Sequence, residues 1–223
     1  MPRLAATVVL LRDHAGRLEI YTQRRAATMA FAPGMYAFPG GSLSSADLVS
    51  GAHAEGASDD RSGGDQAEVG PAPGEAEPEV DASVIRRMGL PPATARAVLR
   101  AAVREVAEET HVRLSPTALA PWARWLTPEF EPRRFDTFFF LAPLPPGQQP
   151  VDPSGEADHA LWVPPGEAIK RLPMLPPTRQ VLTDLAGFAD VASALAAAAR
   201  RDVSEPVRPV IEVDEDGTWL RLR

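Results

Sequence analysis

The sequence predicts an α/β fold, and three observations support this class. Segments typical of strands and of helices follow one another as strands, helix, strands, helix and a final hairpin, an order that indicates a mixed α/β domain. Apolar residues make up 44% of the 223 residues, which is enough to build one sizeable core. A chain of this length suggests a second domain only weakly. We therefore expect residues 1–223 to form a single domain.

The first elements are expected to be a hairpin followed by a glycine-rich loop. Residues 3–12 form a continuous apolar run rich in β-branched side chains, which is typical of a buried strand. A turn at residues 13–16 connects this run to residues 18–23, whose alternating pattern indicates the second strand. Residues 32–41 combine proline, glycine and aromatic residues, and we expect them to form a loop.

An acidic segment is expected to interrupt the domain. Residues 44–82 carry ten acidic residues and one basic residue, a net charge of −9, so the rest of the chain has a net charge of +2. The segment is rich in Gly, Pro and Ala and has no aromatic residue, a composition typical of a disorder-like insertion. The weakly basic remainder is unlike a general nucleic-acid-binding protein and is compatible with a small anionic substrate.

The second half of the chain is expected to supply two helices and several strands. A helix over residues 92–110 is predicted from the proline at its start, its Ala, Leu, Arg and Glu content and its apolar stripe. The other expected elements are strands at 122–127, 134–142 and 159–163, a helix at 178–201 with a break at Gly187, and a hairpin of 210–213 with 218–222. The Ala-rich stretch at 192–199 is expected to pack internally or to face a second copy of the chain in a homodimer.

The composition excludes several classes of protein. The absence of Cys excludes a disulfide scaffold, a thiolate metal site and a cysteine nucleophile. The apolar run near the first residue is too short to span a bilayer, and no targeting segment is visible. We therefore expect a cytoplasmic protein with neither a membrane nor a nucleic acid as its partner.

Three glutamates gather on one face of the helix predicted at residues 92–110. Glu105, Glu108 and Glu109 lie within an arc of roughly 100° at helical spacing. Their mutual repulsion and their place in the last turns, where the helix dipole disfavours anions, oppose this arrangement unless a cation offsets it. Oxygen ligands on a rigid element suit Mg²⁺ or Mn²⁺. The alternative is a solvated glutamate face that binds no ligand.

A glycine pair and the glutamate helix form two motifs that belong together. They are Phe38-Pro39-Gly40-Gly41 and Arg104-Glu105-Val106-Ala107-Glu108-Glu109. Together they resemble the signature of Nudix hydrolases, although more than forty residues interrupt the signature in this chain. Asp47 or Arg96 stands at the position of the first signature glutamate, depending on the half from which one counts, and His111 replaces the final glycine.

The resemblance implies a fold, a reaction and a set of site residues. It implies a Nudix-like α/β/α sandwich with a mixed central sheet, and a pyrophosphatase that hydrolyses the diphosphate bridge of nucleoside-diphosphate-linked substrates. Mg²⁺ or Mn²⁺ would be held by Glu105 and Glu109, helped by Glu108 and the carbonyl of Gly41. Gly40 and Gly41 would let the backbone approach the diphosphate. Glu108 is our first choice for the base that takes the proton of the attacking water, and Glu156 is the second.

Residues around the glycine loop narrow the resemblance. Residues 20–26, Gly34 and 38–41 are similar to the motif of coenzyme A pyrophosphatases, and residues 31–34 with the interrupted signature look more like the acyl-CoA diphosphatase branch. Residues 125–128, 132–137 and 176–178 are similar to that branch too. The implied substrate is CoA or acyl-CoA, cleaved to 3′,5′-ADP and (acyl-)phosphopantetheine. The alternatives are a pyrophosphatase for ADP-ribose, NADH or another nucleotide, and an inactive Nudix-fold regulatory or binding domain.

Arginines are the natural partners of substrate phosphates, because the guanidinium fork binds phosphate oxygens in pairs. The candidates are Arg24, Arg25, Arg133 and Arg134. Each of them has an alternative role in which it pairs with a surface acid, and such exposed ion pairs are common and weak.

Overall fold

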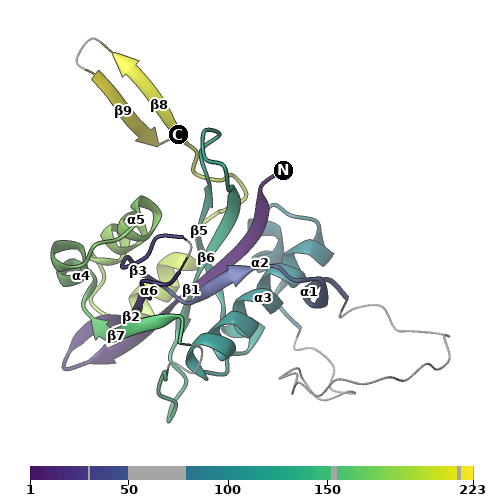
Figure 1. Ribbon diagram of the computed structural model, residues 1–223. Coiled ribbons are helices and arrows are strands. Elements are labelled where there is room, and N and C mark those ends of the chain that lie inside the picture. Colours follow the sequence, from purple (N-terminus) through teal and green to yellow (C-terminus); the bar gives the residue numbers. More distant parts are fainter. Residues whose placement is uncertain (30, 50–78, 152–154, 215–216, 223) are drawn as a thin grey trace, which may run out of the picture.

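The computed structural model describes residues 1–29, 31–49, 79–151, 155–214 and 217–222, and its central element is a seven-stranded sheet (Figure 1). The path of the sheet is β3-β2-β1-β6-β5, with β4 paired to β1 and β7 paired to β2. β1 and β6 are parallel, whereas the other pairs are antiparallel. The strands are β1 (Arg3–His14), β2 (Arg17–Arg25), β3 (Tyr36–Ala37), β4 (Gly40–Ser42), β5 (Ala120–Leu126), β6 (Phe135–Pro143) and β7 (Ala157–Val163). The mixed sheet is as expected, and β3 and β4 add two short strands to the expected loop.

One face of the sheet is covered by the helices that carry the glutamates. These are α1 (Ser45–Val49), α2 (Ala82–Arg87) and α3 (Pro92–Thr110), followed by the short 3₁₀ turn η1 (Pro116–Ala118). α3 has the bounds that the sequence predicts. Its first residue is a proline, whose missing N–H costs nothing there, and it ends where His111 adopts φ 58° and closes the helix with a left-handed cap. Its buried alanines, Val98, Leu99 and Val106 pack on alternate residues of β1 and β6.

The other face is covered by α4 (Pro165–Arg171), α5 (Pro176–Leu185) and α6 (Val191–Ala198). Their core includes Trp122, Phe139 and Leu141 from β5 and β6, and Leu182 and Leu185 from α5. The chain therefore folds as an α/β/α sandwich. The helix expected at 178–201 with a break at Gly187 is present as α5 and α6, which lie on either side of that glycine. Asp190 caps the second helix through a capping box with Ser193.

The sheet opens into a fork near its centre. β1 pairs with β4 through Ala5, Ala6 and Thr7, and with β2 only through Leu11 to His14. β2 and β4 therefore diverge from the same strand, and the C-terminal half of α3 lies against this opening. At this fork, backbone and side chains of β2, β4 and α3 come close to one another.

The ends of the acidic insertion differ from the expectation. Residues 42–49 do not belong to a disorder-like stretch: Ser42 ends β4, and α1 packs on α3. α2 begins at Ala82. The expected insertion at 44–82 otherwise falls mainly on residues 50–78, which lie outside the described residues. The expected terminal hairpin is present as β8 (Pro209–Asp214) and β9 (Gly217–Leu222), which form a sheet of their own at one end of the molecule (Figure 1); its turn at 215–216 is outside the described part.

Candidate functional site

The three glutamates of α3 do not share one environment. Glu109 is only 8% exposed, and the side chain of Glu105 is 15% exposed. The side chain of Glu108 is 55% exposed and lies on the solvent side of the helix. Residues four apart stand one above the other on a helix, so Glu105 and Glu109 face the fork together. The alternative of a fully solvated glutamate face is therefore wrong for this pair.

The glycine pair lies directly against the two buried carboxylates. The backbone N–H of Gly40 donates to Oε1 of Glu109 at 3.4 Å. A Cβ atom on Gly41 would overlap the carboxylate of Glu105, and a Cβ atom on Gly40 would lie 2.6 Å from Cα of Thr7. Position 40 thus requires glycine because the backbone of β1 approaches it closely, whereas at position 41 a Cβ atom would displace the movable carboxylate of Glu105. The two halves of the interrupted signature are adjacent in space.

Burial makes the two carboxylates hard to ionise in the absence of a cation. The pKa of Glu109 is raised to about 8, chiefly by burial and also by the charges of Glu105 and Glu156, against the hydrogen bonds from Gly40 and Gln23. Burial also raises the pKa of Glu105, in opposition to the favourable charge of Arg104. A divalent cation between the two would reverse both effects, because it favours the ionised forms.

The donor set fits a hard cation only in part. Glu105 and Glu109 supply carboxylate oxygens, and the backbone of Gly41 lies against Glu105. Carboxylate and carbonyl oxygens are ligand types of Mg²⁺ and Mn²⁺. Within the described ranges, no three His, Cys, Asp or Glu side chains converge so that they could hold a metal ion. A cation at this place would therefore need neutral oxygens or water beside the two carboxylates.

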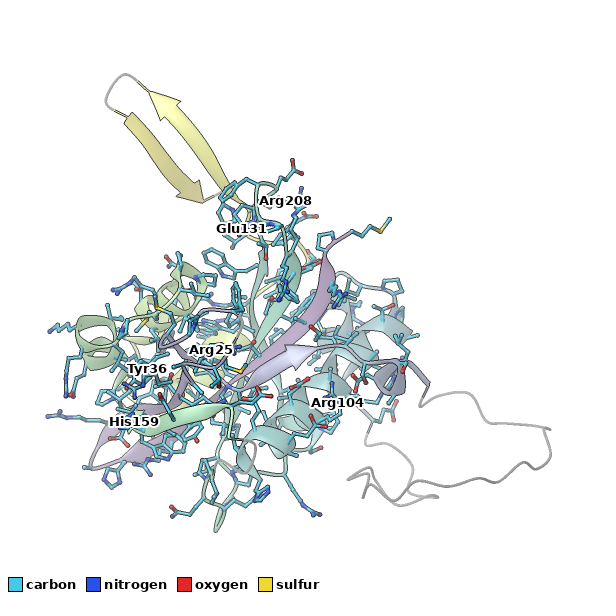
Figure 2. The ribbon with its side chains drawn as sticks, in the orientation of Figure 1. Arg25, Tyr36, Arg104, Glu131, His159 and Arg208 are labelled. Carbon is cyan, nitrogen blue, oxygen red and sulfur yellow. The ribbon has the colours of Figure 1, made fainter. Side chains whose placement is uncertain are left out.

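Arg104 ties the glycine loop, α1 and the glutamates together. It donates to Asp47 through Nε at 3.1 Å and Nη2 at 2.9 Å, and to the carbonyl of Ser42 at 3.2 Å. Its Nη1 donates to Glu105 at 3.0 Å and to Glu108 at 2.9 Å. The carboxylate of Glu108 is thus held by Arg104 in this structure. Figure 2 shows Arg104 on the α3 side of the sheet.

Asp47 takes the place that the signature gives to its first glutamate. Asp47 is 4% exposed, and the backbone N–H of Ser44 also donates to its carboxylate at 2.7 Å. Burial opposes the ionisation of Asp47, but the hydrogen bonds from Arg104 and Ser44 outweigh this effect and lower its pKa. The sequence left Asp47 and Arg96 open for this position, and the structure selects Asp47. The five-residue spacing from Gly41 was the signal.

Gln23 is a further residue of the site, which the sequence analysis did not single out. It lies near the end of β2, is 7% exposed, and donates from Nε2 to Oε2 of Glu109. Its Oε1 is buried and has no hydrogen-bond partner. The visible signal was a polar residue at the end of a predicted buried strand, immediately before Arg24.

Arg24, Arg25 and Glu156 lie at the open end of β2. Arg24 pairs with Asp158 at 2.6 Å, and Nε of Arg25 donates to the carbonyl of Phe31 at 2.9 Å. The carbonyl of Glu156 accepts from the backbone N–H of Ala26 at 2.8 Å, which brings the exposed loop of Glu156 beside this strand end. Arg25 appears near Tyr36 and His159 in Figure 2. The alternative role of Arg24, a pair with an acid, is the one seen here.

Arg133 and Arg134 lie elsewhere. Nε of Arg134 donates to the carbonyl of Thr127 at 3.1 Å, and Arg134 lines an open hollow of about 330 Å³ with Phe130 and Arg208. Arg133 is exposed in the same loop between β5 and β6. Figure 2 shows Arg208 and the loop residue Glu131 at the end of the molecule near β8, well separated from Arg104. The structure therefore does not bring this arginine pair to the glutamates.

Comparison with known proteins agrees with this geometry. Residues 93–185 match the family model of the NUDIX domain, a range that begins in α3 and ends in α5. A search of curated proteins finds no match to the chain. This part of the chain is thus similar to NUDIX domains.

Solved structures extend the likeness to the whole fold. A NUDIX hydrolase from Alicyclobacillus acidocaldarius is 24% identical, with a TM-score of 0.64 over 88% of this chain and 96% of its own. The NUDIX domain of Shewanella oneidensis NrtR, solved with ADP ribose, is 12% identical, with a TM-score of 0.50 over 82% of this chain and 85% of its own. The likeness to these two structures shows the fold of the chain. No helix in the described part is long and apolar enough to cross a membrane.

Proposed function

We propose that this chain is a divalent-cation-dependent hydrolase that cleaves the diphosphate bridge of a nucleoside-diphosphate-linked substrate. The supporting observation is the pair Glu105 and Glu109, buried together against Gly40 and Gly41 with raised pKa values. An arrangement of this kind is unfavourable unless a cation stabilises it. Glu105, Glu109 and the carbonyl of Gly41 are the proposed ligands of Mg²⁺ or Mn²⁺.

The mechanism assigns separate tasks to the residues around the fork. When bound, the cation would offset the charge of the diphosphate and lower the pKa of a coordinated water. Gly40 and Gly41 leave room for a phosphate to approach the backbone. The oxygen of water forms a bond to one phosphorus, the bond from that phosphorus to the bridging oxygen breaks, and a carboxylate takes the proton of the water.

Glu156 and Glu108 are the two candidates for that carboxylate. Glu108 accepts a hydrogen bond from Arg104 at 2.9 Å, so its carboxylate is already engaged by a guanidinium. Glu156 is exposed, and its charge reaches Glu109. The geometry therefore shifts our preference from Glu108 to Glu156.

CoA or acyl-CoA is the proposed substrate, with 3′,5′-ADP and (acyl-)phosphopantetheine as products. The proposal rests on the motif at residues 20–41 and on Arg24 and Arg25, which lie at the same end of β2 as Gln23 and the glutamates. The alternative is ADP-ribose, because the NrtR domain of the same fold is known with ADP ribose.

The test is a substrate panel with a matched pair of variants. Purified protein is incubated with Mg²⁺ or Mn²⁺ and CoA, acetyl-CoA, ADP-ribose or NADH, and the products are separated by chromatography. We expect turnover of CoA and acetyl-CoA, loss of turnover in Glu109→Gln, and normal turnover in Glu167→Gln, which alters an exposed glutamate of α4. Turnover of ADP-ribose or NADH alone would move the substrate to that class. No turnover of any substrate, with no binding of Mn²⁺, would indicate a regulatory domain.

A further inference from the structure

Gln23 presents a buried polar atom that the fold leaves without a partner. Gln23 is more than nine-tenths buried, and its Oε1 accepts no hydrogen bond. Buried polar atoms are nearly always paired, so one without a partner points to a ligand or a water that belongs there. The strand alternates its side chains between the two faces of the sheet, and Gln23 shares the face of Tyr21, which packs with α3.

The position of Glu109 fixes the direction of the Gln23 amide. Nε2 donates to Oε2 of Glu109, and this is the arrangement that a cation-bound, ionised carboxylate requires because it offers only acceptors. The amide oxygen is bonded to the same carbon as this nitrogen, so Oε1 lies within the same enclosed space as the carboxylate. An uncharged side-chain oxygen at that place would add to the two carboxylates, since no third acidic side chain of the described residues converges there.

We infer that Gln23 belongs to the cation site, where Nε2 holds Glu109 in place and Oε1 supplies a neutral oxygen to the cation or to one of its waters. This inference rests on the proposed function. It explains why an amide, and not an apolar side chain, occupies a buried position of β2. Amide oxygens are ordinary ligands of hard divalent cations. Residues that orient a metal ligand commonly change metal affinity by 10–100-fold when they are replaced.

The experiment measures Mn²⁺ binding directly, by calorimetry or by electron paramagnetic resonance, without substrate. Gln23→Met keeps the volume of the side chain and removes both polar atoms. The matched control is Thr22→Val, which removes the hydrogen bond from the buried Thr22 to the carbonyl of Ala37 at 2.9 Å and does not touch Glu109. We expect Gln23→Met to weaken Mn²⁺ binding at least about tenfold and Thr22→Val to change it less than twofold.

Gln23→Glu separates a ligand role from a packing role and covers the case in which Gln23→Met does not fold. It keeps the oxygen and adds a charge, so we expect it to be less stable without metal and to bind Mn²⁺ more tightly than the parent chain. Unchanged Mn²⁺ affinity in folded Gln23→Met, or no gain in Gln23→Glu, would overturn the inference and leave the proposed function standing. A parent chain that does not bind Mn²⁺ would overturn both.

Discussion

The ion pair of Asp47 with Arg104 joins the glycine-loop half of the signature to its helix half, and its removal should be costly. Asp47→Asn is nearly isosteric and removes the charge. The wild-type carboxylate accepts from Arg104 at 3.1 and 2.9 Å and from Ser44 at 2.7 and 2.9 Å. Asp47 is 4% exposed, so water cannot replace these hydrogen bonds without local opening.

The expected cost follows from the partners that remain. Removing one member of a buried pair costs about 3–5 kcal/mol. Arg104 keeps its hydrogen bonds to Glu105, Glu108 and the carbonyl of Ser42, so we expect a value at the low end, about 3 kcal/mol. For a domain of this size, about 3 kcal/mol corresponds to a fall in melting temperature of about 6–12 °C.

The assay is thermal and urea unfolding followed by circular dichroism, with a second ion pair as the control. Glu167→Gln removes an exposed pair with Arg171 on α4, four residues apart, and should cost about 0.3–0.5 kcal/mol. If Asp47→Asn unfolds within about 1 °C of the wild type, Arg104 does not depend on Asp47 and our account of the bracing is wrong.

Two further predictions concern the metal-free site. The pKa of Glu109 in the folded state is about 8, against an ordinary value of 4.5. Between these pH values the folded state retains a proton that the unfolded state loses, so the free energy of unfolding should fall as the pH rises from one value to the other. The fall should be on the order of 5 kcal/mol and absent in Glu109→Gln; parallel urea-unfolding profiles of the two proteins would contradict it. The methyl group added in Gly41→Ala meets only the movable carboxylate of Glu105, so this variant should bind Mn²⁺ more weakly while its fold persists, as calorimetry would show. The methyl group added in Gly40→Ala meets the backbone of β1 and should lower the free energy of unfolding by about 2 kcal/mol or more, as thermal unfolding would show. Equal loss of stability in both variants would be inconsistent with this difference.

The helices that could be predicted from the sequence are those whose own residues favour helix, without help from distant contacts. α3 could be predicted to its ends because Pro92 begins a helix favourably and the interior residues favour helix. α1 could not, because the composition of residues 44–82 as a whole conceals five residues whose helix is stabilised by tertiary contacts with α3. α4 begins at Pro165, which occupies the first helical position, where proline is well tolerated. The helix propensities of its residues alone did not indicate this helix.

The members of the site were less predictable than the elements. Glu105 and Glu109 follow from helical spacing, but their burial relative to Glu108 depends on how α3 is rotated against the fork. The importance of Gln23 depends on a contact across 86 positions of sequence, which no local pattern reveals. Arg133 and Arg134 were candidates on residue type alone, and the direction of β6 carries them away from the glutamates.

The interruption of the signature is compatible with an intact site because loop closure is a weak function of length. The family signature separates its first glutamate from its arginine by seven residues, whereas 56 residues separate Asp47 from Arg104. This is an eightfold increase, or three doublings, and even a fully flexible connection would add about 2 kcal/mol to the cost of closure. The contacts that oppose this cost are the pair of Asp47 with Arg104, the hydrogen bond from Arg100 to the carbonyl of Asp47 at 2.8 Å and the packing of α2 on α3. The bracing residues therefore lie on both sides of residues 50–78, where they determine the geometry of the glycine loop independently of the segment between them.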